Sequence, residues 1–188
     1  MNHKIILASN SPRRKELLKG LDIDFEVRVI PGIDESYPED LPTAEIPRFI
    51  AHKKAEAYRE SILPGELVIT ADTVVVLDGR IIEKPAGRDE AIRMIKCLSG
   101  RKHQVITAVV LMTAEKWKTF SVTSTVDFSE LTAEEIEYYV DKYAPFDKAG
   151  AYGIQEWIGY IGVRSIEGSF YNVMGLPVQR LYHELKAF

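Results

Sequence analysis

Three long segments rich in β-branched residues limit what this chain can fold into: ELVITADTVVVL (66–77), HQVITAVVLMT (103–113) and WKTFSVTSTVDF (117–128). Their content of β-branched and aromatic residues predicts three long β-strands. The first run is followed by Asp78-Gly79, a pair that favours a tight hairpin turn, and RIIEKP (80–85) is the expected return arm. The second and third runs are predicted to form a long hairpin with each other. Because hairpins pair strands antiparallel, the pattern predicts a mixed sheet rather than a purely parallel one.

The segments around these runs predict helices and shorter strands. Thr132 and Glu135 form the sequence signature of a capping box, which predicts a helix to about Tyr143. We therefore expect an α/β fold in which helices flank a mixed sheet. The remaining expectations are strands at 4–8 and 24–30, loops at 31–43 and 147–155, helices at 43–59 and 89–98, a hairpin over 158–173 that turns near Glu167-Gly168, and a last helix after Gly175-Leu176-Pro177.

A length of 188 residues is enough for one ordinary domain or two tightly joined lobes, and we expect a single domain over residues 1–188. The composition excludes several classes of protein. With 46% hydrophobic and 28% charged residues, the chain can form a normal core. A net charge of −4 argues against a chain-wide grip on a nucleic acid polymer, although it allows a local basic pocket. No stretch approaches the ~20 apolar residues of a membrane span, and the first apolar run is too short for a signal peptide. The single cysteine, Cys97, is expected to be a small core thiol, which fits a protein of the reducing cytoplasm.

The stretch ASNSPRRKELLKG (8–20) predicts a helix with an unusual first turn. Ser11 is a suitable N-cap and Pro12 suits the first helical position. Arg13, Arg14 and Lys15 then follow, at the end of the helix where the dipole favours acidic residues. An anion bound there, or acidic side chains nearby, would offset this cost. A phosphate site and a solvated basic helix end are both compatible with the stretch, which lacks the glycines of a Walker A loop.

Carboxylates and lysines elsewhere supply candidate catalytic groups. Asp72 interrupts a β-branched run, so it is expected at a strand end, paired with a cation, or bound to a metal; an exposed edge position is the alternative. Thr73 would face the opposite side of a regular strand. Glu35, in the loop segment IDES, is of a type that suits Mg²⁺. Helical periodicity does not decide whether Lys53 or Lys54 reaches a site.

The four histidines show no spacing typical of a metal site, and His103 is expected to have a structural or surface role.

Five segments together resemble the Maf family of nucleoside triphosphate pyrophosphatases: ASNSPRRKELL, ADTVV, EKP, LSGRKHQVITAV and DKAGAYGIQ. They occur in the order typical of that family, and the resemblance covers essentially the whole chain. The form DKAGAYGIQ is similar to the subgroup that hydrolyses dTTP and UTP, whereas the 7-methyl-GTP subgroup has a different sequence there.

The resemblance implies a fold with two lobes around a central cleft, as in Maf and ITPase-like proteins, and often a homodimer. It also implies roles for particular side chains. Asp72 matches the catalytic carboxylate, described as a proton acceptor, and Lys54 rather than Lys53 matches a pocket residue. The remaining matches are substrate-choice positions at Arg13, Thr73 and Gln155, and polar pocket positions at Ser9, Glu35 and Lys84.

The reaction implied by the resemblance is cleavage between the α and β phosphates of a nucleoside triphosphate, giving a monophosphate and pyrophosphate. A divalent cation, Mg²⁺ or Mn²⁺, would be held by Asp72 and Glu35. Two alternatives stay open: the same reaction on another base, such as 7-methyl-GTP, CTP or a modified nucleotide, and a nucleotide-binding regulator of cell division. The family usually has Gly after the position of Gln155; here Glu156 and Trp157 follow, which leaves the base preference open.

Overall fold

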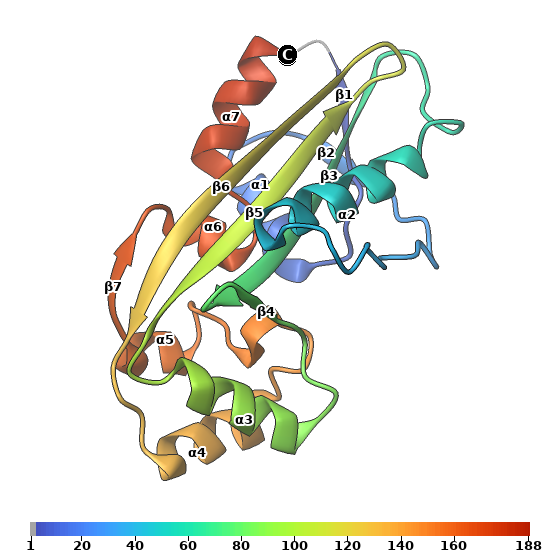
Figure 1. Cartoon of the computed structure of the whole chain (residues 1–188). Helices are drawn as coiled ribbons and strands as arrows, with labels where there is room; N and C mark the ends of the chain where they lie inside the picture. Colours follow the sequence, from blue (N-terminus) through green and yellow to red (C-terminus); the bar gives the residue numbers. More distant parts are fainter. Residues whose placement is uncertain (1–2) are drawn as a thin grey trace. The chain divides into compact units, whose positions relative to one another are not determined.

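The computed structural model describes residues 3–188 of the chain (Figure 1). Its strands are β1 (Lys4–Leu7), β2 (Phe25–Val27), β3 (Glu66–Leu77), β4 (Arg80–Ile82), β5 (Lys102–Met112), β6 (Trp117–Phe128) and β7 (Val163–Glu167). Its helices are α1 (Pro12–Lys19), α2 (Ile46–Glu56), α3 (Arg88–Leu98), α4 (Ala133–Tyr143), α5 (Trp157–Gly162), α6 (Phe170–Met174) and α7 (Val178–Ala187), with short 3₁₀ turns η1 (Thr43–Glu45) and η2 (Ala149–Ala151).

The strands form one mixed sheet of seven strands, as the hairpin pattern predicts. Its order is β2-β1-β3-β5-β6-β7, and β4 pairs with β3. β1 runs parallel to both β2 and β3, whereas the β3–β4 and β6–β7 pairs are antiparallel. The predicted α/β class with a mixed sheet and flanking helices is therefore confirmed.

The chain divides into two compact units. The first unit contains the chain up to Thr73 together with Thr107–Val122 and Gly175–Phe188, and the second contains Val74–Ile106 and Thr123–Met174. β3, β5 and β6 each contribute to both units, because the boundaries fall within these strands. This division agrees with the two expected lobes, while the cleft stays a prediction.

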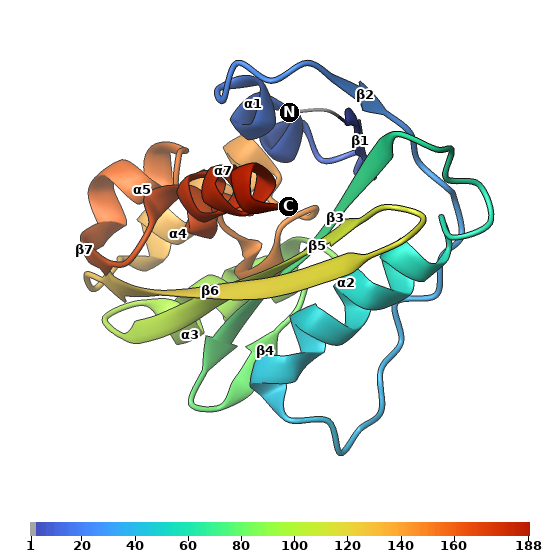
Figure 2. The same ribbon diagram turned by 90° about the horizontal axis from the view of Figure 1, so that it is seen from above.

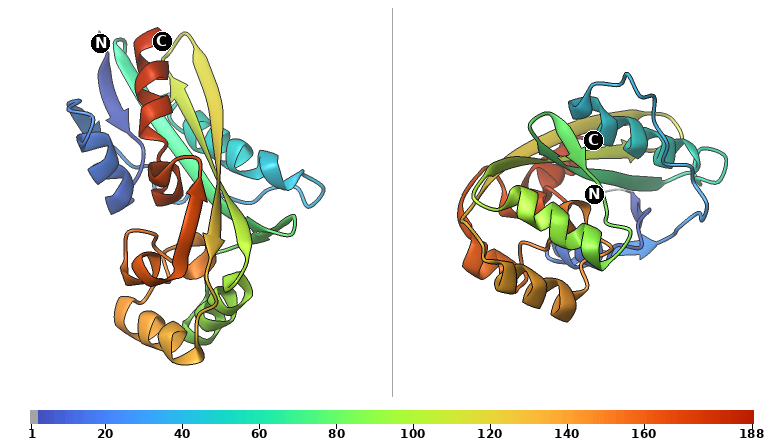
Figure 3. Two further views of the ribbon diagram at one scale, coloured as in Figure 1. Left: turned by 90° about the vertical axis from the view of Figure 1, so that its left-hand side faces the viewer. Right: turned by 60° about the horizontal axis from the view of Figure 1, so that its bottom comes forward.

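In the first unit, helices cover both faces of the sheet. α2 lies on one face, and α1 and α7 lie on the other (Figures 2 and 3). Ala51 and Ala55 of α2 are fully buried against Ile6, Val68 and Val110 of β1, β3 and β5. Small residues let the helix approach the strands closely, so this packing fixes which α2 side chains reach the sheet.

In the second unit, α3 and α4 lie side by side (Figures 1 and 3). α4 begins with the predicted capping box: the Glu135 N–H donates to Thr132 Oγ1 at 3.2 Å, and the Thr132 N–H donates to Glu135 Oε2 at 2.8 Å. The predicted hairpin after β3 is also present, with Asp78 and Gly79 at φ values of 50° and 76°. These left-handed values are the reason that an Asp-Gly pair suits this turn.

The expected hairpin over 158–173 is wrong. The segment forms α5, then the strand β7, then α6. β7 pairs with β6, with Ile166 opposite Val126, so its partner is distant in sequence rather than the next segment. The Ser169 N–H donates to Ser124 Oγ at 3.0 Å, and Ser124 Oγ donates to the Ser169 carbonyl at 3.1 Å. These bonds fix the chain after β7 in a conformation that does not continue into a second strand of a hairpin.

Two other elements are shorter than expected. β2 ends at Val27 because the chain leaves the sheet, and the Ile30 N–H instead donates to the hydroxyl of Tyr58 at 3.0 Å. The helix expected from Thr43 to about Arg59 begins at Ile46, after the 3₁₀ turn η1, and ends at Glu56.

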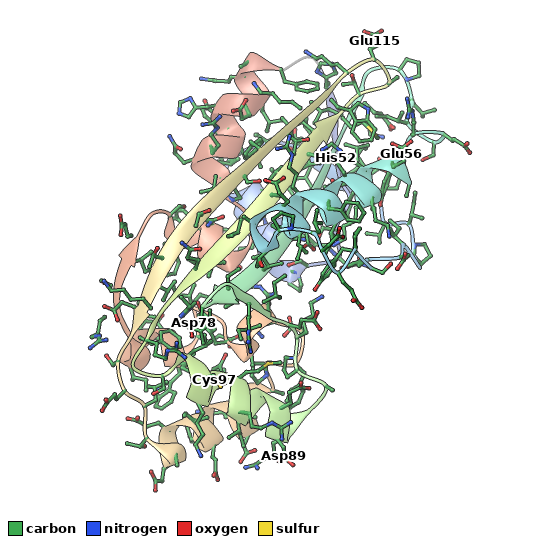
Figure 4. The ribbon with its side chains drawn as sticks, viewed as in Figure 1. His52, Glu56, Asp78, Asp89, Cys97 and Glu115 are labelled. Carbon is green, nitrogen blue, oxygen red and sulfur yellow. The ribbon has the colours of Figure 1, made fainter. Side chains whose placement is uncertain are left out.

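The expectation that Cys97 is a core thiol is also wrong. Cys97 is exposed on α3 (Figure 4), because the buried face of that helix consists of Ala91, Ile95 and Leu98. Within residues 3–188, none of the helices has the length and apolar character needed to cross a bilayer.

His103 is a buried titratable group in the core of the second unit. It is 2% exposed, its Nε2 lies 2.7 Å from the Tyr152 hydroxyl, and its ring packs edge-on against Phe128. Its Nδ1 has no hydrogen-bond partner among the described residues. An imidazolium needs an acceptor for each N–H, so burial lowers the pKa of His103 to about 4.

This shift predicts a loss of stability in mild acid. The folded pKa lies below the unfolded value, so the contribution of neutral His103 is fully present above pH ~6.5 and is lost as pH falls toward 4. The loss would amount to about 3 kcal/mol of unfolding free energy. His103→Gln, which does not titrate, should show a flatter dependence between pH 7 and 4.5 in urea denaturation. Parallel curves for the two proteins would contradict this assignment.

Candidate active site

Asp72 lies in the middle of β3, among buried apolar residues of the first unit. The residue is 9% exposed, and its neighbour in the strand, Ala71, is buried. Lys54 of α2 forms an ion pair with this carboxylate, since its Nζ lies 2.8 Å from Asp72 Oδ1. Burial raises the pKa of Asp72, and the ammonium of Lys54 opposes that shift. The structure therefore shows a buried carboxylate paired with a cation, and not an exposed position at a sheet edge.

Glu35 joins the same ammonium from the loop after β2. Its Oε1 lies 3.2 Å from Lys54 Nζ, so Lys54 bridges Glu35 and Asp72. Lys53, one position earlier on α2, instead contacts Asp34 Oδ2 at 2.8 Å. Each of the two lysines therefore pairs with a different carboxylate of the loop, Lys53 with Asp34 and Lys54 with Glu35. Of the two, Lys54 is the one that also reaches β3.

The turn before α1 carries Ser9 and Ser11. The Ser11 N–H donates to Ser9 Oγ at 3.2 Å, and Ser11 Oγ accepts from the Arg14 N–H at 3.4 Å, which confirms the predicted N-cap. Ser9 is buried, and Arg13 is half-buried at the second helical position. The turn and the first helical N–H groups form a cationic end of the kind that suits phosphate oxygens.

Arg14 has a structural role that the sequence does not reveal. Its Nε donates to the Gly175 carbonyl at 2.9 Å and its Nη1 donates to the Ala71 carbonyl at 2.9 Å. Its Nη2 donates to Thr73 Oγ1 at 3.0 Å. Burial lowers the pKa of the Arg14 guanidinium, and Asp72 counters this effect. Of the three cations of this turn, Arg14 thus holds α1, β3 and the start of the α7 segment together.

Thr73 is held by this guanidinium and by a second hydroxyl. Thr73 Oγ1 lies 2.9 Å from Thr107 Oγ1 of β5. Because Arg14 only donates, Thr73 Oγ1 is an acceptor toward it, and the direction of the Thr73 hydroxyl proton is left to its other contacts. No sequence signal marked Thr107, which lies inside a continuous apolar strand.

The last two predicted site residues belong to the second unit. Lys84 is exposed, two residues after the end of β4. Gln155 precedes α5, and its Oε1 is buried without a hydrogen-bond partner among residues 3–188. A buried amide oxygen without a donor is costly, so this oxygen is suited to accept from a bound molecule.

Two carboxylates in this structure are suited to a divalent cation. No group of three or more His, Cys, Asp or Glu side chains that could hold a metal occurs in the described part of the chain. Glu35 and Asp72 nevertheless converge on one nitrogen. Mg²⁺ commonly takes one or two protein carboxylates and completes its shell with water and substrate phosphates. The pair therefore fits such an ion.

The fold and these side chains define a mixed-sheet α/β protein whose first unit combines a buried carboxylate with a cationic helix end, a combination suited to phosphate chemistry. Residues 4–188 match the family described as Maf-like protein, and the chain belongs to that family.

Several bacterial proteins named dTTP/UTP pyrophosphatase are similar to this chain over nearly its whole length. The dTTP/UTP pyrophosphatase of Bacteroides thetaiotaomicron is 62% identical over 98% of this chain and 95% of its own length. That of Parabacteroides distasonis is 62% identical over 99% and 96%, and that of Porphyromonas gingivalis W83 is 56% identical over 99% and 94%. Among solved structures, a HAM1 protein from Coxiella burnetii has a TM-score of 0.46 and 17% identity, with coverage of 99% of this chain and 100% of its own.

The contacts of Arg14 predict a large difference between two identical substitutions. Arg14→Lys removes a planar donor group that serves three acceptors, so we expect the unfolding free energy to fall by about 2–4 kcal/mol. Arg13→Lys, at a half-buried neighbour, should cost less than ~1 kcal/mol. Urea denaturation of both variants measures the difference, and equal losses would contradict the structural role of Arg14.

Proposed function

We propose that this chain hydrolyses nucleoside triphosphates, with dTTP and UTP as its substrates, to the nucleoside monophosphate and pyrophosphate. The proposal rests on one observation: the buried Asp72 carboxylate and Glu35 both form ion pairs with Lys54. The names of the Maf-like relatives, at up to 62% identity over nearly the whole chain, support the choice of substrates. A protein that only binds nucleotides has no need of a carboxylate buried at this energetic cost.

The phosphate chemistry would be performed by side chains that neutralise charge and hold a water molecule. Phosphoryl transfer is accelerated mainly by positioning and electrostatic stabilisation. In our proposal, Asp72 orients the attacking water and accepts its proton. Ser9, Arg13 and Lys84 bind the phosphates together with Lys54.

A divalent cation fits the same carboxylates. Glu35, and secondarily Asp72, would hold Mg²⁺ or Mn²⁺, which when bound neutralises charge on phosphate oxygens. A carboxylate tightly bound to a metal is a poor proton acceptor. We therefore assign Asp72 as the proton acceptor and Glu35 as the main ligand of the cation.

Base choice would depend on Gln155 and Thr73. The buried Gln155 Oε1 needs a donor, and the imide N3–H of thymine and uracil is one, whereas the N3 atom of cytosine is an acceptor. A site whose buried polar group is left unpaired by the wrong ligand rejects it strongly. Thr73 would add one further hydrogen bond.

The remaining expectations form part of the same proposal. The chain would act as a single domain over residues 1–188, as a cytoplasmic homodimer, on a small nucleotide and without a nucleic acid polymer or a membrane as partner.

A panel of triphosphates tests the substrate. Pyrophosphate release would be measured with dTTP, UTP, CTP and 7-methyl-GTP, each with Mg²⁺ or Mn²⁺. We expect kcat/KM for dTTP and UTP to exceed that for CTP by about 100-fold or more, since the N3 atom of cytosine cannot donate to Gln155 Oε1. Preference for another base would contradict the choice of dTTP and UTP as substrates. Tight binding without turnover would favour a nucleotide-binding regulator.

Asp72→Asn tests the proton acceptor with little change in size. Loss of a positioned base typically lowers turnover by about 10²–10⁴-fold, so we expect a fall in kcat for dTTP of that order. Asp78→Asn, the same substitution in the exposed β3–β4 turn, is the matched control and should stay within about twofold of wild type. Near-normal pyrophosphate release by Asp72→Asn would show that the carboxylate has another role.

A further inference from the structure

Glu156 begins α5 with both carboxylate oxygens engaged inside the second unit. Its Oε2 accepts a hydrogen bond from the hydroxyl of Tyr139, and its Oε1 lies 3.1 Å from Lys148 Nζ. The two charged side chains are only 19% and 10% exposed. A carboxylate so enclosed needs a cation and a donor to offset its lost hydration, and Lys148 and Tyr139 supply them.

Tyr139 connects this carboxylate to the turn that carries Gln155. The Tyr139 hydroxyl donates to Glu156 and accepts from the Gly153 N–H at 2.9 Å. The Glu156 N–H in turn donates to the Gly153 carbonyl at 2.9 Å. The turn 153–156 is thus closed by one backbone hydrogen bond and anchored at both ends to the same buried phenol.

Two glycines allow this close packing. A Cβ atom on Gly153 would lie 2.7 Å from the Glu156 carboxyl carbon, and one on Gly159 would lie 1.8 Å from the Ile154 carbonyl oxygen. These separations are well below van der Waals contact, so the Glu156 carboxylate lies directly over the backbone of Gly153. Its place is therefore fixed by shape as well as by hydrogen bonds.

We propose that Glu156 is a positioning residue for base recognition, which acts through Tyr139 and Lys148 to hold the turn 153–156 and thereby the amide of Gln155. This inference rests on the proposed function, in which Gln155 reads the base. Since both Glu156 oxygens are engaged, the residue acts through the turn and not as a direct contact to the nucleotide. Gln155 Oε1 has no partner in the described part of the chain, so its direction depends on the backbone that carries it.

Glu156→Ala is the direct test, with the dTTP and CTP kinetics of the folded protein as the readout. A recognition group displaced by about 1 Å can lose its contact, so we expect KM for dTTP to rise about tenfold while kcat stays within threefold. The ratio of kcat/KM for dTTP over CTP should fall by about tenfold. A purely structural role would lower the amount of folded enzyme without changing KM or this ratio.

Three further variants sharpen the test. Glu156→Gln retains an acceptor for Tyr139 and should restore most of the base preference. Gly153→Ala changes none of the hydrogen-bonding side chains, but its added methyl group would displace the Glu156 carboxylate, so this variant should behave like Glu156→Ala. Glu137→Ala removes an exposed glutamate of α4 and is the matched control, expected within twofold of wild type in KM and base ratio.

Amide hydrogen exchange gives a readout that is independent of activity. The Gly153 amide donates to the Tyr139 hydroxyl, so Glu156→Ala should accelerate its exchange by about tenfold. Unchanged exchange, or an unchanged base ratio in an active Glu156→Ala enzyme, would overturn the inference while leaving the proposed function intact. Failure of the wild-type protein to release pyrophosphate from any triphosphate would instead overturn the proposed function itself.

Discussion

The ion pair between Asp72 and Lys54 is the interaction on which the candidate site depends. A carboxylate within a buried β-strand is tolerated only with a cation close by. That cation comes from α2, whose Ala51 and Ala55 pack against the sheet and so bring Lys54 to within 2.8 Å of Asp72. The same ammonium also pairs with Glu35, which lies in a loop that has little regular structure of its own. Apolar packing of one helix thus organises the acidic part of the site.

The cations at the start of α1 serve different purposes. The helix dipole disfavours all of them at that end. Arg14 is stabilised by the carbonyls of Ala71 and Gly175, so its charge is used to join segments that are distant in sequence. Arg13 is half-buried at the same helix end and is the residue we assign to phosphate binding. The unusual composition of the turn therefore combines one structural arginine with one proposed functional arginine.

Local signals in the sequence were enough to predict many elements and insufficient for others. The capping box at Thr132 and the Asp-Gly turn at 78–79 depend on neighbouring residues, and both are present. The segment 158–173 was mispredicted because its strand pairs with β6, and Cys97 because helical position alone does not determine burial. For the site, periodicity left Lys53 and Lys54 equivalent, whereas the fold separates them. The roles of Thr107 and Tyr139 depend on contacts with residues that are distant in sequence, and a local sequence pattern does not predict such contacts.

A double-mutant cycle on Asp72 and Lys54 measures whether these two side chains act as one unit in catalysis. The quantity to measure is kcat/KM for pyrophosphate release from dTTP by the wild type, Asp72→Asn, Lys54→Met and the double variant. Residues that act as a unit are strongly non-additive, so the double variant should be no more than about threefold worse than the poorer single variant. Losses that multiply, as they do for independent sites, would contradict the account.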